Sequence, residues 1–181
     1  MRDALLVIDV VDDFRHADSD RLLVSFRERL PAMRAVLGEA REAGIPVIYA
    51  NDNRGVWDGD AKRMIREAIE RRPGGDLVAE VAPRAGERFV AKPRYSAFDL
   101  TPLELILADV DAERLLVIGA SLEMCVAQTA IDARERGWKV TVIPAACPAV
   151  DQEMADVAVR YLERVAGVRM HWEASIPSLV A

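Results

Sequence analysis

The sequence predicts a three-layer α/β/α fold, built on a doubly wound, mostly parallel, Rossmann-like sheet of six strands. Short apolar runs alternate with longer stretches of helical spacing along the chain. These runs are continuously apolar, as strands buried on both faces are. Glycine and proline separate the two kinds of segment. With right-handed crossovers we expect the strand order 3-2-1-4-5-6, which leaves a crevice between the first and fourth strands.

The first two expected strands flank a long helix. Residues 4–9 form an apolar run that suits a central strand. Residues 22–43 carry apolar side chains at helical spacing, and Gly44 ends that helix. Pro31 predicts a junction between this helix and a preceding helical turn. Residues 45–50 then form the second strand.

The middle of the chain is strongly charged. Residues 61–72 predict an amphipathic helix, which the Pro-Gly-Gly sequence at 73–75 ends. The following segment, 76–87, is expected to be mostly irregular. Residues 88–92 form the short third strand, and Pro93 ends it.

A strand–turn–helix unit dominates the second half. A helix over residues 101–108 precedes it, with a threonine cap and proline at its first position. The fourth strand covers 115–118, the chain turns at 119–121, and a helix starts at Cys125 and ends before Gly137. The remaining expected elements are strands 140–143 and 168–171 and a helix over 152–165.

The composition restricts the classes of function. The 181 residues favour a single domain over 1–181, and the net charge of −6 provides no basic footprint for nucleic acid. No apolar run is long enough to span a bilayer, so we expect no membrane partner. Two cysteines and no signal-peptide pattern predict a cytoplasmic protein. Apolar helix faces and the C-terminal tail favour a homo-oligomer, a dimer or tetramer.

Three residues at strand ends are candidates for catalysis. Asp9 ends the first apolar run, Lys92 ends the third, and Cys125 follows the fourth. The carboxyl ends of parallel strands meet at one edge, so these side chains are expected to converge. Each also has a commoner role: a capping aspartate, a solvated lysine and a small buried thiol.

An acid, an amine and a thiol in one cleft form a nucleophile system. Asp9 can take the thiol proton and return it to a leaving amine. Lys92 can hold that carboxylate and favour the thiolate. The backbone N–H groups of Ser121 and Cys125 can stabilise an oxyanion. This is the chemistry of an amidase that forms a covalent acyl-enzyme without a metal, and we expect no cofactor because phosphate-binding glycine patterns are absent.

The motifs around these residues resemble the isochorismatase-like cysteine hydrolases, which include nicotinamidases and N-carbamoylsarcosine amidohydrolases. The resemblance covers nearly the whole chain and rests on residues 5–14, 91–98, 119–133 and 146–149. It implies that Asp9, Lys92 and Cys125 match the family triad. It also implies a cis peptide bond between Ala120 and Ser121.

The sequence departs from nicotinamidases in ways that bear on the substrate. Their Asp-x-His…His metal site is replaced here by Asn51-Asp-Asn-Arg-Gly55, so no bound zinc is expected. Leu122 and Tyr95 stand where family members often have threonine and histidine, which suggests a different, more apolar pocket. The expected pocket walls are Phe14, Asn51, Trp57, Tyr95, Phe98, Leu122 and Met124.

The predicted function is therefore cysteine-dependent hydrolysis of a small amide, imide or ureide. Two alternatives remain open. One is a vinyl-ether hydrolase of the isochorismatase type that does not need the thiol, and the other is a non-catalytic protein that binds a small molecule. Arg15, Arg54 and Arg94 are candidates for pairing with a substrate carboxylate, although solvated surface charge is the commoner role of arginine.

Overall fold

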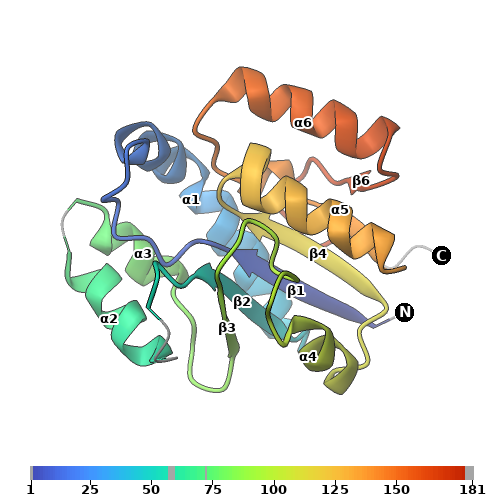
Figure 1. Cartoon of the computed structure of the whole chain (residues 1–181), viewed down its shortest axis with the longest axis horizontal. Helices are drawn as coiled ribbons and strands as arrows, with labels where there is room; N and C mark the ends of the chain where they lie inside the picture. Colours follow the sequence, from blue (N-terminus) through green and yellow to red (C-terminus); the bar gives the residue numbers. More distant parts are fainter. Residues whose placement is uncertain (1, 57–59, 72, 178–181) are drawn as a thin grey trace.

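The computed structural model describes residues 2–56, 60–71 and 73–177, so the pocket role expected for Trp57 falls outside the described residues. Within them the chain folds around one central sheet (Figure 1). Its strands are β1 (Asp3–Ile8), β2 (Val47–Asp52), β3 (Arg88–Lys92), β4 (Arg114–Gly119), β5 (Lys139–Val142) and β6 (Arg169–Met170).

The sheet has the order β3-β2-β1-β4-β5-β6, and every neighbouring pair is parallel. This confirms the predicted topology. The chain leaves β1 toward β2 on one side and returns to β4 on the other, so the switch point lies between β1 and β4. Ligands of open α/β sheets bind at the carboxyl ends of the strands beside such a point.

Helices cover both faces of the sheet, with α5 in front of it and α1 behind it in Figure 1. On one side α1 packs against α3, and on the other α5 packs against α6. The α-helices are α1 (Ser19–Glu42), α2 (Ala61–Glu70), α3 (Gly75–Val81), α4 (Leu103–Asp109), α5 (Ala127–Glu135) and α6 (Gln152–Arg164). None of the described helices has both the length and the apolar character needed to cross a membrane.

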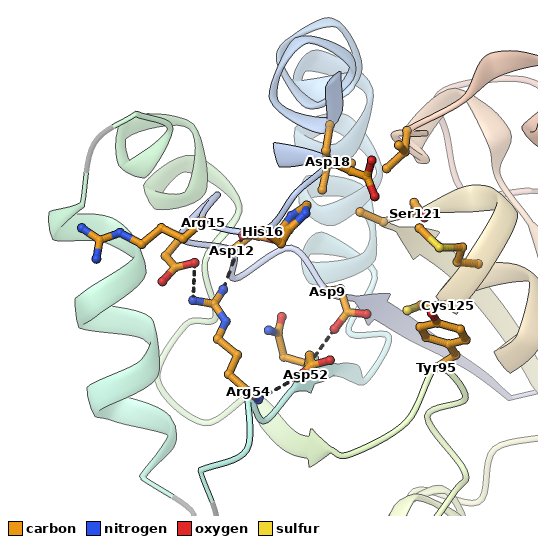
Figure 2. A pocket seen from close by; sticks show the side chains of 16 residues that line it. Asp9, Asp12, Arg15, His16, Asp18, Asp52, Arg54, Tyr95, Ser121 and Cys125 are labelled. Atoms are coloured by element: carbon orange, nitrogen blue, oxygen red, sulfur yellow. Dashed lines mark hydrogen bonds and ion pairs between the residues drawn. The ribbon is translucent and has the colours of Figure 1, made fainter. Parts of the chain in front are cut away.

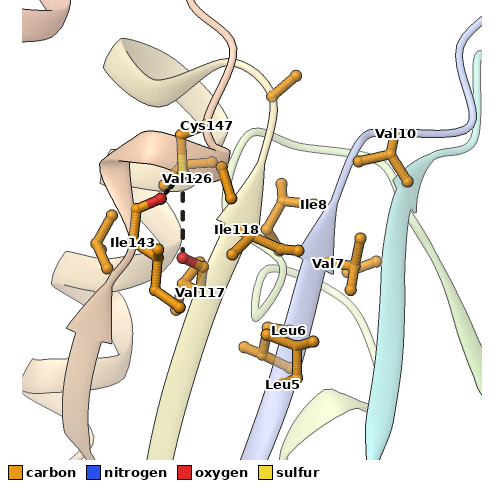
Figure 3. Packing of buried hydrophobic residues seen from close by; sticks show 14 of the residues in the cluster. Leu5, Leu6, Val7, Ile8, Val10, Val117, Ile118, Val126, Ile143 and Cys147 are labelled. Carbon is orange, nitrogen blue, oxygen red and sulfur yellow. Dashed lines mark hydrogen bonds between the residues drawn. The ribbon is translucent and has the colours of Figure 1, made fainter. Parts of the chain in front are cut away.

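The core lies between these layers and centres on β1 and β4 (Figure 3). Residues 4–8 and 115–118 are completely buried, which explains why both runs lack polar side chains. Burial of this apolar surface contributes roughly 25 cal/mol per Å² to folding. The second cysteine, Cys147, packs in this core, where its thiol donates to the carbonyl of Ile143 at 3.3 Å.

Two helix predictions are wrong. No junction occurs at Pro31, because α1 runs unbroken through it. The buried face on both sides of the proline, with Phe26 and Met33, holds the helix together despite the missing N–H. The segment expected to be irregular contains α3, a helix of seven residues that is too short to show a clear period. Leu77 and Val81 bury its inner face.

Candidate active site

Asp9 leaves β1 through an unusual backbone turn. Its φ of +46° lies in the left-handed region, which aspartate tolerates better than most residues. Its N–H still donates to the carbonyl of Ala50 at 3.0 Å, so the turn is anchored to β2. One side-chain oxygen of Asp9 accepts from the backbone N–H of Asp52 at 2.6 Å. The carboxylate is thereby fixed at the edge of the sheet.

The turn after β4 places Cys125. Gly119 has a φ of +112°, and a Cβ there would lie 2.0 Å from the carbonyl oxygen of Ile8. Only glycine fits this close approach between β4 and β1. The next peptide bond, Ala120–Ser121, is cis, as the resemblance implies.

The prediction that Cys125 opens an α-helix is wrong, because it lies in a π-helical turn over Leu122–Val126. The N–H of Val126 donates to the carbonyl of Ser121, and that of Ala127 donates to Leu122. Both bonds span five residues, a spacing that is rare in proteins and frequently found at functional sites. The α-helix itself begins at Ala127.

The three candidate residues meet at this edge of the sheet. The Nζ atom of Lys92 lies 2.7 Å from an oxygen of Asp9 and 3.5 Å from the sulfur of Cys125. It also donates to the carbonyl of Arg94 at 3.0 Å. The Lys92 side chain is completely buried, and that of Asp9 is 14% exposed. Lys92 is therefore held between a carboxylate and a thiol and is closed off from solvent.

The electrostatics of this trio favour a neutral thiol in the free protein. Burial raises the pKa of Cys125 well above its ordinary value, and the neighbouring charge of Asp9 raises it further, against the opposite effect of Lys92. Burial also raises the pKa of Asp9, although Lys92 and the thiol oppose this. Burial alone would lower the pKa of Lys92, but Asp9 and Cys125 raise it overall. The raised pKa of Cys125 thus opposes the thiolate that the charge of Lys92 alone would favour.

A cavity of about 530 Å³ opens above the trio (Figure 2). Of the residues expected there, Asp9, Asn51, Tyr95, Ala120, Ser121, Met124 and Cys125 line it. Three others do not. Phe14 packs edge-on against Phe26, Phe98 stacks on Trp138, and Leu122 is buried in the core. These apolar side chains were expected in the pocket, but they pack within the protein core instead.

The sequence interpretation missed most of the polar wall opposite Cys125 and named only Arg15 and Arg54 from it. It consists of Asp12, Asp13, Arg15, His16, Asp18, Asp52 and Arg54. Arg54 holds this wall together, because its guanidinium pairs with Asp13 at 2.7 Å and Asp12 at 3.5 Å. The available signal was a cluster of polar residues directly after two strand ends.

Buried hydrogen bonds hold the loops around the cavity in place. The side chain of Asn51 donates to the carbonyl of Val11 and accepts from its N–H, both at 3.0 Å. The hydroxyl of Thr129 accepts from the N–H of Ala97 at 3.0 Å, which ties the segment after Lys92 to α5. Within the described residues, no group of three or more His, Cys, Asp or Glu is arranged to hold a metal ion.

A doubly wound sheet with a polar cavity at its switch point defines a class of α/β proteins that bind small molecules there. Within that class the chain belongs to the isochorismatase family, whose domain matches residues 3–174. The uncharacterized isochorismatase family protein YaaI of Bacillus subtilis is 30% identical over 163 residues, 90% of this chain and 89% of that protein.

Other relatives are named for the reactions they catalyse. Maleamate amidohydrolase of Pseudomonas putida is 26% identical over 148 residues, which cover 77% of this chain and 69% of that protein. The crystal structure of N-carbamoylsarcosine amidase from Thermoplasma acidophilum superposes with a TM-score of 0.70 at 28% identity. That match covers 94% of this chain and 95% of that one. The family therefore includes amidohydrolases, which supports a hydrolase.

Proposed function

We propose that this protein is a cysteine-dependent hydrolase of a small C–N substrate, an amide, imide or ureide. The observation that carries the proposal is the direct contact of buried Lys92 with Asp9 and Cys125, both of which line the cavity. The amidohydrolases among its relatives support the same class of bond.

In the first half-reaction the thiol of Cys125 transfers its proton to Asp9 as sulfur attacks the substrate carbonyl carbon. Because burial raises the pKa of Asp9, that carboxylate is a stronger base than an exposed aspartate. The positive charge of Lys92 stabilises the sulfur as it becomes negative. The carbonyl electrons move to oxygen, where backbone N–H groups of Ser121 and Cys125 stabilise the oxyanion.

In the second half-reaction the oxyanion collapses and the C–N bond breaks. Asp9 returns its proton to the leaving nitrogen, and a thioester remains on Cys125. Water then enters the cavity and loses a proton to Asp9 as it attacks the thioester. The carboxylic acid product leaves, and the thiol regains its proton.

The test is ammonia release from matched primary amides, namely butanamide, 3-aminopropanamide and succinamate, and from their ureide analogues. Intact mass of acid-quenched samples detects an acyl group on Cys125. We expect Cys125→Ala to abolish both signals, and the matched variant Cys147→Ala to retain them. Turnover that survives Cys125→Ala would contradict the proposal and favour the thiol-free reaction of vinyl-ether hydrolases. No turnover and no acyl group in the wild type would favour a binding protein.

A further inference from the structure

One polar group in the cavity wall has no partner in the protein. The hydroxyl of Ser121 makes no hydrogen bond to any described residue, and only 5% of this residue is exposed. A buried hydroxyl without a hydrogen-bond partner destabilises a protein unless a ligand or water satisfies it. Ser121 also lines the cavity, close to Cys125 (Figure 2). Its hydroxyl is thus available to turn toward a polar ligand in the cavity.

The charges around the cavity indicate which ligand it receives. Four of the five aspartates that line it are paired with cations. Asp9 is paired with Lys92, as described above, and Arg54 holds both Asp12 and Asp13. Asp18 pairs with Arg21 at 2.5 Å. Asp13 also lies 3.8 Å from the guanidinium of Arg71, so four cations face these four carboxylates.

Asp52 is the exception. It has no ion-pair partner among the described residues, and its side chain accepts only from the backbone N–H of Arg54, at 2.6 Å. Asp52 ends β2, in register with Lys92 on β3, but the Lys92 amine is bonded to Asp9. Asp52 is exposed, and its carboxylate stands beside the candidate base at the rim of the cavity, where the buried charge of Lys92 balances it only in part.

The arginines do not offset this negative charge. The guanidinium of Arg54 is occupied by aspartates, and that of Arg15 points away from Cys125 in Figure 2. Arg94 does not line the cavity. None of the three arginines considered for a substrate carboxylate is thus placed to bind one near the thiol.

We propose that the site takes amides that carry an ammonium group or several N–H donors and no carboxylate, with Asp52 as the residue that determines this specificity. Rotation of the Ser121 side chain would let its hydroxyl meet a substrate N–H group, because the hydroxyl has no partner among the described residues to lose. The inference rests on the proposed function, because the ligand is placed against Cys125. A substrate carboxylate would meet the carboxylate of Asp52, which has no ion-pair partner among the described residues, and like charges close together repel one another even at an exposed rim.

The charge preference can be measured on Cys125 without any substrate. Two methanethiosulfonates of similar size, one with a trimethylammonioethyl and one with a sulfonatoethyl group, each transfer their thioalkyl group to a thiolate and release methanesulfinate. We expect the rate ratio of cationic to anionic reagent at Cys125 to exceed that of 2-mercaptoethanol by about five- to tenfold. Peptide mass mapping assigns the label to Cys125.

Asp52→Asn keeps an oxygen that can accept from Arg54 and removes only the charge. We expect it to bring the ratio back toward that of 2-mercaptoethanol, while the matched exchange Asp99→Asn, outside the cavity, leaves the ratio unchanged. A wild-type ratio equal to that of the free thiol, or one that Asp52→Asn does not change, would overturn the inference. Labelling requires no hydrolysis, so this result is separate from the ammonia assay, whose failure would count against the proposed function alone.

Discussion

Two buried ion pairs lie at opposite edges of the same sheet. At the carboxyl edge, Lys92 of β3 reaches Asp9 at the end of β1, with an N–O distance of 2.7 Å. At the amino edge, Arg114 of β4 binds Asp3 of β1, its direct partner in register, through two bonds of 2.8 and 2.6 Å. Both pairs join segments that are far apart in sequence and neighbours in space.

The two pairs differ in what surrounds them. The guanidinium of Arg114 engages both oxygens of Asp3, and both side chains are below 10% exposed. Each carboxylate oxygen of this pair already accepts a hydrogen bond from the guanidinium, and no thiol of the described residues lies beside the pair. The amine of Lys92 contacts Asp9, a backbone carbonyl and Cys125, and Asp9 lines the cavity. The same type of contact therefore supports the fold at one edge and is available for chemistry at the other.

The largest expected effect is on amide hydrolysis, which should depend on the carboxyl edge of the sheet and not on the amino edge. Removing the thiol in Cys125→Ala should lower amide hydrolysis by at least about 10³-fold, because the nucleophile is lost. The free energy of unfolding, measured by urea titration, should change far less. Asp3→Asn at the other edge should leave turnover of the folded protein within about threefold of wild type. A larger loss of turnover in folded Asp3→Asn would show that the two edges are not independent.

The next effect is on the free energy of unfolding, to which the ion pair at the amino edge of the sheet should contribute. Asp3→Ala leaves the Arg114 charge buried without its partner, so we expect a loss of about 3–5 kcal/mol in the free energy of unfolding. The double variant Asp3→Leu/Arg114→Met should recover much of this loss, because no charge remains buried. Urea titration of the three proteins measures both effects. A cost below about 1 kcal/mol for Asp3→Ala would contradict a structural role for this pair.

A smaller effect is expected at Ser121. Replacing it with alanine removes a hydroxyl that has no partner in the described protein, so stability should stay equal or rise. If the hydroxyl binds substrate, KM should increase roughly five- to tenfold, equivalent to about 1 kcal/mol, with kcat changed less. Ser121→Thr, which keeps the hydroxyl, serves as the control. An unchanged KM would remove Ser121 from the binding site.

Much of this arrangement could be predicted because it follows from strong local patterns. Continuous apolar runs fixed the strands and their order, and polar residues at the ends of those runs identified Asp9 and Lys92. The π-helical turn could not be predicted, because its hydrogen bonds differ by only one residue from those of an α-helix. The burial of Phe14 and Phe98 depends on packing across layers, which no local pattern encodes. The homo-oligomer and the cytoplasmic location stay predictions.

The central claim is that Asp9 and Lys92 shift the pKa of the Cys125 thiol in opposite directions. The most direct measurement is the pH dependence of Cys125 alkylation by iodoacetamide in wild type, Asp9→Asn and Lys92→Met, with Cys147 as an internal control. The raised pKa of Cys125 predicts slower wild-type labelling at pH 8 than for a free thiol. Cys147, whose pKa burial raises to about 12, should stay unlabelled.

The two variants should shift this profile in opposite directions. Asp9→Asn removes a negative charge that raises the pKa of Cys125, so labelling at pH 8 should become faster while amide hydrolysis falls. Lys92→Met removes the charge that lowers this pKa, so labelling should become slower still. Profiles that coincide in all three proteins would contradict the account, because neither group would then influence the thiol.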